Sequence, residues 1–192
     1  KEDYIIMDVR YFGTVEYMPS PLDNKISREA AVATIFTFLN VKKNVLPKSE
    51  VDKILKQYKD SNEVTYALRE VFAFAIKEKI LNGTSSKQLL PKQQCDGRTF
   101  CTIVLRALGY NISGSDSDVA AAILAEKGGL SIREAVRLNY KKLIRDDVIG
   151  IEYAMFNAKR SDGKTVIEKL KEERVINVKK AEEYGLIQKE AK

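Results

Sequence analysis

Apolar side chains recur at helical spacing through most of this chain, and the pattern is clearest between Gly97 and Tyr110. The apolar positions of that stretch fall on one face of a helix: Phe100, Ile103, Val104, Ala107 and Leu108. Asp96 or Gly97 can cap the start of this helix, and Gly109 can supply a left-handed stop. The spacing therefore predicts a short, buried helix with Arg98 at its start.

Two other stretches resemble this one. Ser27-Arg28-Glu29-Ala30 opens an apolar helix that ends at Leu39-Asn40, and Ser131-Ile132-Arg133-Glu134-Ala135 opens another that runs to Leu143. Ser131 and Glu134 have the spacing of a capping box. Three helix starts that each carry an arginine predict an internal repeat.

The same periodicity predicts further helices, over 48–58, 64–76, 119–126, 165–173 and 178–184, and a break near Gly150 within 140–156. The repeating unit is then a helix, a glycine-bearing loop and an arginine helix, with units near 26–40, 58–110 and 116–144. The first arginine helix lacks a preceding helix. Because a helical hairpin cannot bury its apolar face alone, we expect the C-terminal helix, 165–187, to complete the first unit, in cis or in trans. Residues 20–187 form one helical domain in this interpretation.

Residues 1–19 differ from the rest and form an N-terminal extension. They are rich in β-branched and aromatic side chains, among them Tyr4, Ile6, Val9 and Tyr11, and Pro19 and Pro21 end the run. This composition predicts a short β segment, one strand or a hairpin. A lone strand leaves its edges unpaired, so we expect the segment to pair with itself, with the helical body or with another copy.

Composition narrows the class of protein. Apolar residues make up 44% and charged residues 31% of the 192 positions, as in globular proteins, and no apolar run approaches the length of a spanning helix. The net charge of +6 is spread along the chain; it fits a solvated surface or attraction to an anionic partner such as an acidic polysaccharide. Dense basic blocks with interleaved aromatics are missing, which argues against nucleic acid. The chain starts at Lys1-Glu2-Asp3, and we expect no signal peptide within it.

Catalytic and metal chemistry find little support. Histidine is absent, which removes the commonest general base and metal ligand. Cys95 and Cys101 are too few for a disulfide scaffold; a bridge between them requires favourable local geometry. Asp146 and Asp147 are adjacent, so on a helix they diverge and cannot flank one glycosidic bond. We therefore expect no enzyme, no metal and no cofactor.

The middle unit resembles an S-layer homology (SLH) motif. The residues that carry the resemblance are, in order, Tyr58-Lys59-Asp60, Tyr66-Ala67, Ile80-Leu81-Asn82-Gly83, Leu90-Pro91, Gly97-Arg98-Thr99-Phe100 and Leu105-Arg106-Ala107-Leu108-Gly109. They are similar to that family's aromatic-x-Asp, aromatic-Ala pair, Ile-x-Gly loop, proline and Thr-Arg-Ala-Glu-like helix start. The Arg28 and Arg133 motifs resemble the same last element, so the resemblance covers roughly 20–187. Tyr66 stands where the family often has tryptophan.

The resemblance implies a mainly α fold of three helical hairpins around a pseudo-threefold axis. It also implies a bacterial protein at the cell surface or in the cell wall, outside the cell, whose motif arginines meet acidic, often pyruvylated, polysaccharide. The residues implied for that contact are Arg28, Glu29, Arg98, Arg133, Glu134, Tyr66, Asn82 and Gly83. An arginine at a helix start places a forked cation beside free backbone donors, which suits a carboxylate.

Two functions remain open at this point. The first is a self-assembling structural protein of a surface layer or filament, whose N-terminal segment, through Tyr4, Ile6, Val9 and Tyr11, docks on a neighbouring copy. The second is an anchor that binds acidic cell-wall polysaccharide. The arginines can equally be structural, bridging carboxylates or helix carbonyls between hairpins, and the middle motif is the least suited to bind a sugar. We therefore expect the 97–110 helix to serve mainly as core.

Overall fold

The computed structural model describes residues 21–41, 46–183 and 185. The described part is mainly α-helical and contains four isolated β-bridges but no strand. The α-helices are α1 (Arg28–Phe38), α2 (Lys48–Leu55), α3 (Arg69–Lys77), α4 (Gly97–Ala107), α5 (Ala120–Glu126), α6 (Ile132–Leu138), α7 (Arg145–Met155), α8 (Val166–Glu172) and α9 (Val178–Glu183). Three 3-10 helices accompany them: η1 (Ser61–Glu63), η2 (Tyr66–Leu68) and η3 (Gly114–Val119). The predicted N-terminal β segment, with Tyr4, Ile6, Val9 and Tyr11, lies outside the described residues.

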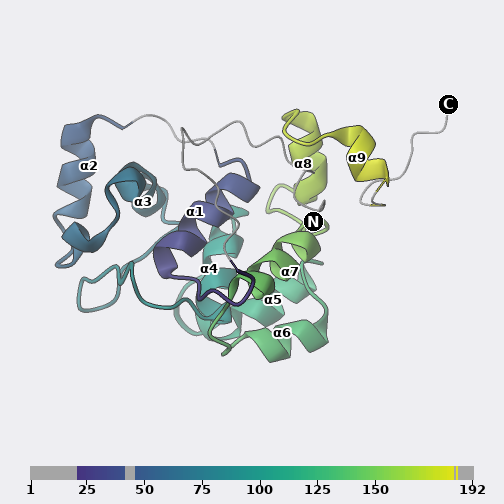
Figure 1. Ribbon diagram of the computed structural model, residues 1–192, viewed down its shortest axis with the longest axis horizontal. Coiled ribbons are helices and arrows are strands. Elements are labelled where there is room, and N and C mark those ends of the chain that lie inside the picture. The colour runs from purple at the N-terminus through teal and green to yellow at the C-terminus, as the bar shows by residue number, and fades with distance from the viewer. Residues whose placement is uncertain (1–20, 42–45, 184, 186–192) are drawn as a thin grey trace.

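The short, buried helix predicted from the periodicity is confirmed as α4, which lies in the middle of the molecule (Figure 1). It packs on α1 and on α5, α5 packs on α6, and α2 packs on α3 at one end of the molecule. Phe100, Ile103, Val104 and Leu108 are all buried in one continuous apolar core. The predicted caps are confirmed: the Asp96 side chain accepts a hydrogen bond from the Thr99 amide at 3.0 Å.

The other predicted helix-end signals are confirmed as well. Gly109 has a φ of +92°, the left-handed conformation that ends a helix. The Ser27 side chain caps α1 through the amide of Ala30, and Ser131 and Glu134 form the capping box of α6. Short polar side chains at these positions satisfy amides that the first turn leaves free.

Three segments meet in a closed ring of backbone hydrogen bonds, and a helix leaves the ring from each of them. We call the segments 22–29, 91–98 and 139–146 the backbone ring. At its centre the amide of Cys95 donates to the carbonyl of Ile26 (2.7 Å), Leu143 donates to Cys95 (2.9 Å), and Ile26 donates to Leu143 (3.1 Å). The cycle closes because each segment donates to one neighbour and accepts from the other.

Two further sets of hydrogen bonds follow the same cyclic order. One joins the amides of Arg28, Gly97 and Arg145 to the carbonyls of Gln93, Lys141 and Asn24; the other joins the amides of Glu29, Arg98 and Asp146 to those of Pro91, Asn139 and Leu22. Helices α1, α4 and α7 therefore begin at corresponding places in the ring. Gly97 suits its place because a Cβ there would lie 2.0 Å from the Leu138 carbonyl oxygen.

The ring changes two predictions around the third arginine motif. The helix predicted from Ser131 to Leu143 ends at Leu138, because the carbonyls of Asn139 and Lys141 accept hydrogen bonds from the start of α4. The helix predicted to break near Gly150 instead runs unbroken from Arg145 to Met155 as α7. The helix that leaves the ring on this side therefore starts at Arg145, and Arg133 lies on α6.

Two smaller differences concern helix type and the thiols. The helix predicted over 64–76 begins as the 3-10 turn η2 and becomes α-helical only at Arg69. Cys95 and Cys101 are both buried, free thiols, so the bridge considered for them is not formed. Burial raises the pKa of each thiol to about 12. Among the described residues, every helix is too short or too polar to cross a bilayer.

Candidate functional site

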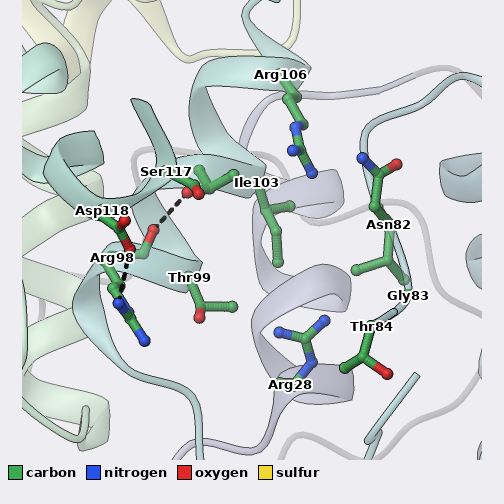
Figure 2. Close-up of a pocket in the computed structure, with 12 residues that line it drawn as sticks. Arg28, Asn82, Gly83, Thr84, Arg98, Thr99, Ile103, Arg106, Ser117 and Asp118 are labelled. Carbon is green, nitrogen blue, oxygen red and sulfur yellow. Dashed lines mark hydrogen bonds and ion pairs between the residues drawn. The ribbon is translucent and has the colours of Figure 1, made fainter. Parts of the chain in front are cut away.

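A cavity of about 300 Å³ opens between the start of α1, one face of α4 and the loop after α3. We call it the arginine groove; its charged and polar side chains are Arg28, Asn82, Thr84, Arg98, Thr99, Thr102, Arg106, Ser117 and Asp118. Thr99, Thr102, Ile103 and Arg106 are spaced by three and four residues, so they form a single face of α4. Figure 2 shows Arg28 and Arg106 pointing into the same space, with Asn82 and Thr84 across it.

Arg28 and Arg106 are held by backbone carbonyls. The Nε of Arg28 donates to the Leu89 carbonyl at 3.0 Å, and Nε and Nη2 of Arg106 donate to the Ile112 carbonyl at 2.9 and 2.7 Å. Within the described part of the chain, neither guanidinium forms an ion pair with a carboxylate. The two cations are therefore fixed in position without a direct carboxylate contact, and the charges of Asp96 and Asp60 offset only part of the effect of burial on the pKa of Arg28.

The two positive charges act on each other. Burial lowers the pKa of Arg28, and burial followed by the charge of Arg28 lowers the pKa of Arg106. Both groups stay protonated because an arginine starts from a pKa of 12.5. A partly buried pair of like charges is costly unless an anion joins it, so the arginine groove is suited to an anionic ligand.

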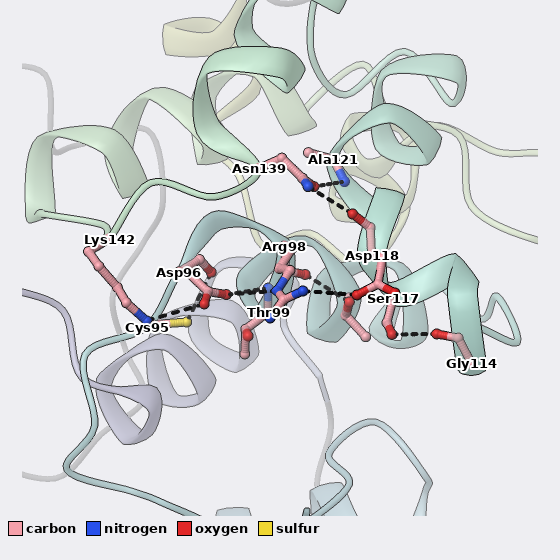
Figure 3. A network of polar contacts seen from close by, with 11 residues as sticks. Cys95, Asp96, Arg98, Thr99, Gly114, Ser117, Asp118, Ala121, Asn139 and Lys142 are labelled. Atoms are coloured by element: carbon pink, nitrogen blue, oxygen red, sulfur yellow. Dashed lines mark hydrogen bonds and ion pairs between the residues drawn. The ribbon is translucent and has the colours of Figure 1, made fainter.

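Arg98 lies at the rim of the groove and, unlike the other two arginines, is paired with a carboxylate. Its Nη1 donates to Oδ1 of Asp118 at 2.9 Å, and its guanidinium lies over the Tyr140 ring, 5.7 Å from the centroid. The side chain of Asn139 donates a hydrogen bond to the backbone carbonyl of Asp118 at 2.8 Å and so holds Asp118 in place (Figure 3). The network joins α4, η3 and the end of α6.

The structure brings four of the eight predicted contact residues together at the groove: Arg28, Asn82, Gly83 and Arg98. Gly83 is also needed for packing, because a Cβ there would lie 2.3 Å from the Tyr58 ring. Arg106, Thr99 and Thr102 also line the groove, and they were not among the predicted contact residues. The signal for them was the polar face that they form along a helix otherwise made of apolar residues.

The other four predicted contact residues lie elsewhere. The Glu29 carboxylate accepts hydrogen bonds from the backbone amide and hydroxyl of Thr65, at 3.1 and 2.9 Å, and from Lys92. Tyr66 is 83% exposed on η2. Arg133 is exposed on α6, and Glu134 closes the capping box with Ser131, which lowers the pKa of its carboxyl. Asp60 of the motif serves structure too, since its buried carboxylate accepts from the amides of Leu89 and Leu90.

A second cavity, of about 520 Å³, lies between α6 and α7, and we call it the α6–α7 groove. Its lining includes Glu134, Arg137, Lys141, Asp147 and Tyr153. Here the cations are paired: Lys141 and Arg137 approach Oδ1 of Asp147 at 2.6 and 3.4 Å. The described residues contain no group of three or more side chains suited to hold a metal ion.

Comparison of the chain with family models, curated proteins and solved structures found no match in any of the three.

Proposed function

We propose that this chain is a non-catalytic, SLH-type protein of the bacterial cell surface that binds an acidic, pyruvylated cell-wall polysaccharide in the arginine groove. The observation that carries the proposal is the pair Arg28 and Arg106, which face one open cavity without a carboxylate partner among the described residues. A neutral sugar would leave both charges without a carboxylate contact, whereas a carboxylate on the sugar would pair with them.

The remaining lining suits a saccharide. Asn82 and Thr84 are exposed on one side of the groove, and Thr99 lies on the other. Amide and hydroxyl groups can both donate to and accept from sugar hydroxyls. The groove thus combines a fixed cationic end for an acid group with neutral polar groups for the ring that carries it.

We further propose the SLH-type arrangement of three helical units around a pseudo-threefold axis. Support comes from the cyclic order of the backbone ring, in which α1, α4 and α7 begin at corresponding places. The C-terminal helix would complete the first unit within the same chain: the Asn40 side chain, after α1, donates to Glu173, after α8, at 2.7 Å.

Sedimentation with purified cell-wall sacculi tests the binding proposal. We expect the wild-type chain to be retained, and Arg28→Gln/Arg106→Gln to lose retention at least about tenfold, because both carboxylate contacts are removed. Arg133→Gln is the matched control, since it removes one exposed arginine outside the groove. Sacculi stripped of pyruvate by mild acid should fail to retain the wild-type chain. Equal retention of the double variant and the wild type would contradict the proposal.

We propose self-assembly as a second function, because one specific observation favours it. Helix α6 exposes large apolar side chains that the fold leaves uncovered: Ile132 is 80% and Val136 is 76% exposed. Contiguous exposed apolar side chains mark interaction surfaces more often than isolated ones do. Such a protein would both hold the cell wall and contact its own copies.

A further inference from the structure

An apolar stripe runs along the outer side of α6. Ile132 and Val136 lie four residues apart, which places them on the same side of α6, and Tyr140 follows two residues after the helix ends at Leu138. Their exposed fractions are 80%, 76% and 71%, while Ala135 and Leu138 of the same helix are buried. The helix therefore buries one side in the core and presents a second apolar side outward. We call Ile132, Val136 and Tyr140 the α6 stripe.

Positive charge borders this stripe. Arg133 directly follows Ile132 and forms no ion pair with a carboxylate of the described residues. Arg137, in contrast, pairs with Asp147, and Arg98, over the Tyr140 ring, pairs with Asp118. Pairing of the α6 stripe with the same stripe of a second copy would bring the two copies of Arg133 close together, which like charges oppose. The surface instead fits a partner that is apolar and carries negative charge.

The chain itself contains such a segment. Residues 1–20 carry four acidic and two basic residues, in a chain whose net charge is +6, and they are rich in apolar side chains, including Tyr4, Ile6, Val9 and Tyr11. We propose that the α6 stripe is the docking surface for residues 1–20 of a second copy of this chain. The inference rests on the self-assembly proposed above and names the surface that receives the segment.

The place where the segment leaves the domain makes this contact head-to-tail. The described chain enters the ring at Leu22, whose carbonyl accepts from the amide of Asp146 at 3.0 Å, at the start of α7. Leu22 is therefore hydrogen-bonded to the start of α7, whereas Ile132 and Val136 of the stripe lie on α6. The donor segment and the receiving stripe are thus different surfaces of one copy. A contact between different surfaces repeats from copy to copy and builds chains or rings.

Full-length variants that each remove one half of the contact test the proposal in sedimentation velocity. Ile132→Gln/Val136→Gln removes the two apolar side chains of the stripe on α6 and keeps the helix, because glutamine favours helix formation. Replacing Tyr4, Ile6, Val9 and Tyr11 with serine removes the apolar side of the segment without changing its charge. We expect each variant to associate about a hundredfold more weakly than the wild type, from two buried aliphatic side chains lost at the stripe. Tyr66→Gln, on the exposed η2, is the matched control and should assemble normally.

An equimolar mixture of the two variants gives the sharper result. One variant keeps the stripe and the other keeps the segment, so we expect the mixture to form discrete heterodimers that neither variant forms alone. Docking of the segment within its own chain predicts no heterodimer and would overturn the proposal. A stripe variant that assembles like the wild type would also overturn it while leaving self-assembly intact. A wild-type chain that stays monomeric at all concentrations would refute self-assembly itself.

Discussion

The arginine groove and the α6–α7 groove are both lined by cations and acids, but they differ in which cations are paired. In the arginine groove Asp118 pairs with Arg98, whereas Arg28 and Arg106 form no ion pair with a carboxylate of the described residues. In the α6–α7 groove Asp147 pairs with Lys141 and Arg137, and its side chain is only 3% exposed. In the arginine groove Arg28 and Arg106 are held by carbonyls alone. Paired charge stabilises the fold, whereas charge of fixed geometry without a carboxylate contact is available to a ligand.

One position accounts for much of this difference. Because Gly97 and Arg145 occupy corresponding places in the backbone ring, Thr99 and Asp147 are the third residues of α4 and α7 respectively. The Oδ2 atom of Asp147 accepts a hydrogen bond from the backbone amide of Ile144 at 3.1 Å and so caps the start of α7. In α4 that capping role belongs to Asp96, so position 99 is left neutral and lines the groove.

Removal of the compensating acid should have the largest effect. Asp147→Ala leaves Lys141 and Arg137 without their partner and uncaps α7, and we expect a loss of about 2–3 kcal/mol in the free energy of unfolding. Urea denaturation measures this. Asp146→Ala is the control, since its side chain is exposed and should change stability by less than about 0.5 kcal/mol. A loss no larger than that of the control would show that Asp147 does not stabilise its groove.

Addition of a carboxylate to the arginine groove is the complementary test of this comparison. Thr99→Asp should compensate Arg28 and Arg106 and thereby weaken binding of the acidic polysaccharide about tenfold, which is about 1.4 kcal/mol. Stability should rise slightly, by about 0.5 kcal/mol, because a negative charge is favourable in the first turn of α4. Calorimetric titration with polysaccharide fragments measures the affinity, and Thr99→Asn controls for size. Unchanged affinity of the aspartate variant would mean that ligand does not meet these arginines.

Lowering the pH should have a smaller effect on stability, and this effect should come from Asp147 of the α6–α7 groove. Burial by itself raises the pKa of Asp147, but its hydrogen bonds from Lys141 and Ile144 and the nearby positive charges outweigh burial and lower it. A carboxyl with a lowered folded pKa contributes stability that is present above its unfolded pKa of about 3.9 and is lost as pH falls through the folded value. We therefore expect the stability of the wild type to fall below about pH 4, and that of Asp147→Ala to fall less. Thermal unfolding between pH 2.5 and 6 measures the two slopes; parallel slopes would contradict the assignment.

Local signals in the sequence were sufficient wherever a residue acts on its own turn of helix. Asp96, Ser27 and the Ser131–Glu134 pair cap the helices predicted for them, since caps depend on residues within three positions. The helical class of the domain followed from periodicity for the same reason. The predicted Ser131–Leu143 helix was wrong in length because its end is set by the start of α4, forty residues away in the chain.

The candidate site was predictable in part. Arg28, Arg98, Asn82 and Gly83 were predicted as contact residues and do line one groove, whereas Arg133, expected to be better suited to a ligand than Arg98, does not line it. In the structure Arg98 is paired with Asp118, Arg133 is exposed on α6, and Arg28 shares its cavity with Arg106. Whether an arginine is paired depends on residues that approach from other helices, which no spacing along the chain reveals.

The 97–110 helix illustrates the difference between what local sequence determines and what tertiary contacts decide. The sequence by itself determined that this stretch is a helix, where it begins and ends, and that Phe100, Val104 and Leu108 are buried, because periodicity and caps are properties of neighbouring residues. Only the tertiary structure decided that its polar face, with Thr99 and Arg106, is one wall of the arginine groove. Closure of the backbone ring sets that wall opposite Arg28, and the ring depends on contacts between segments about 50 to 120 residues apart.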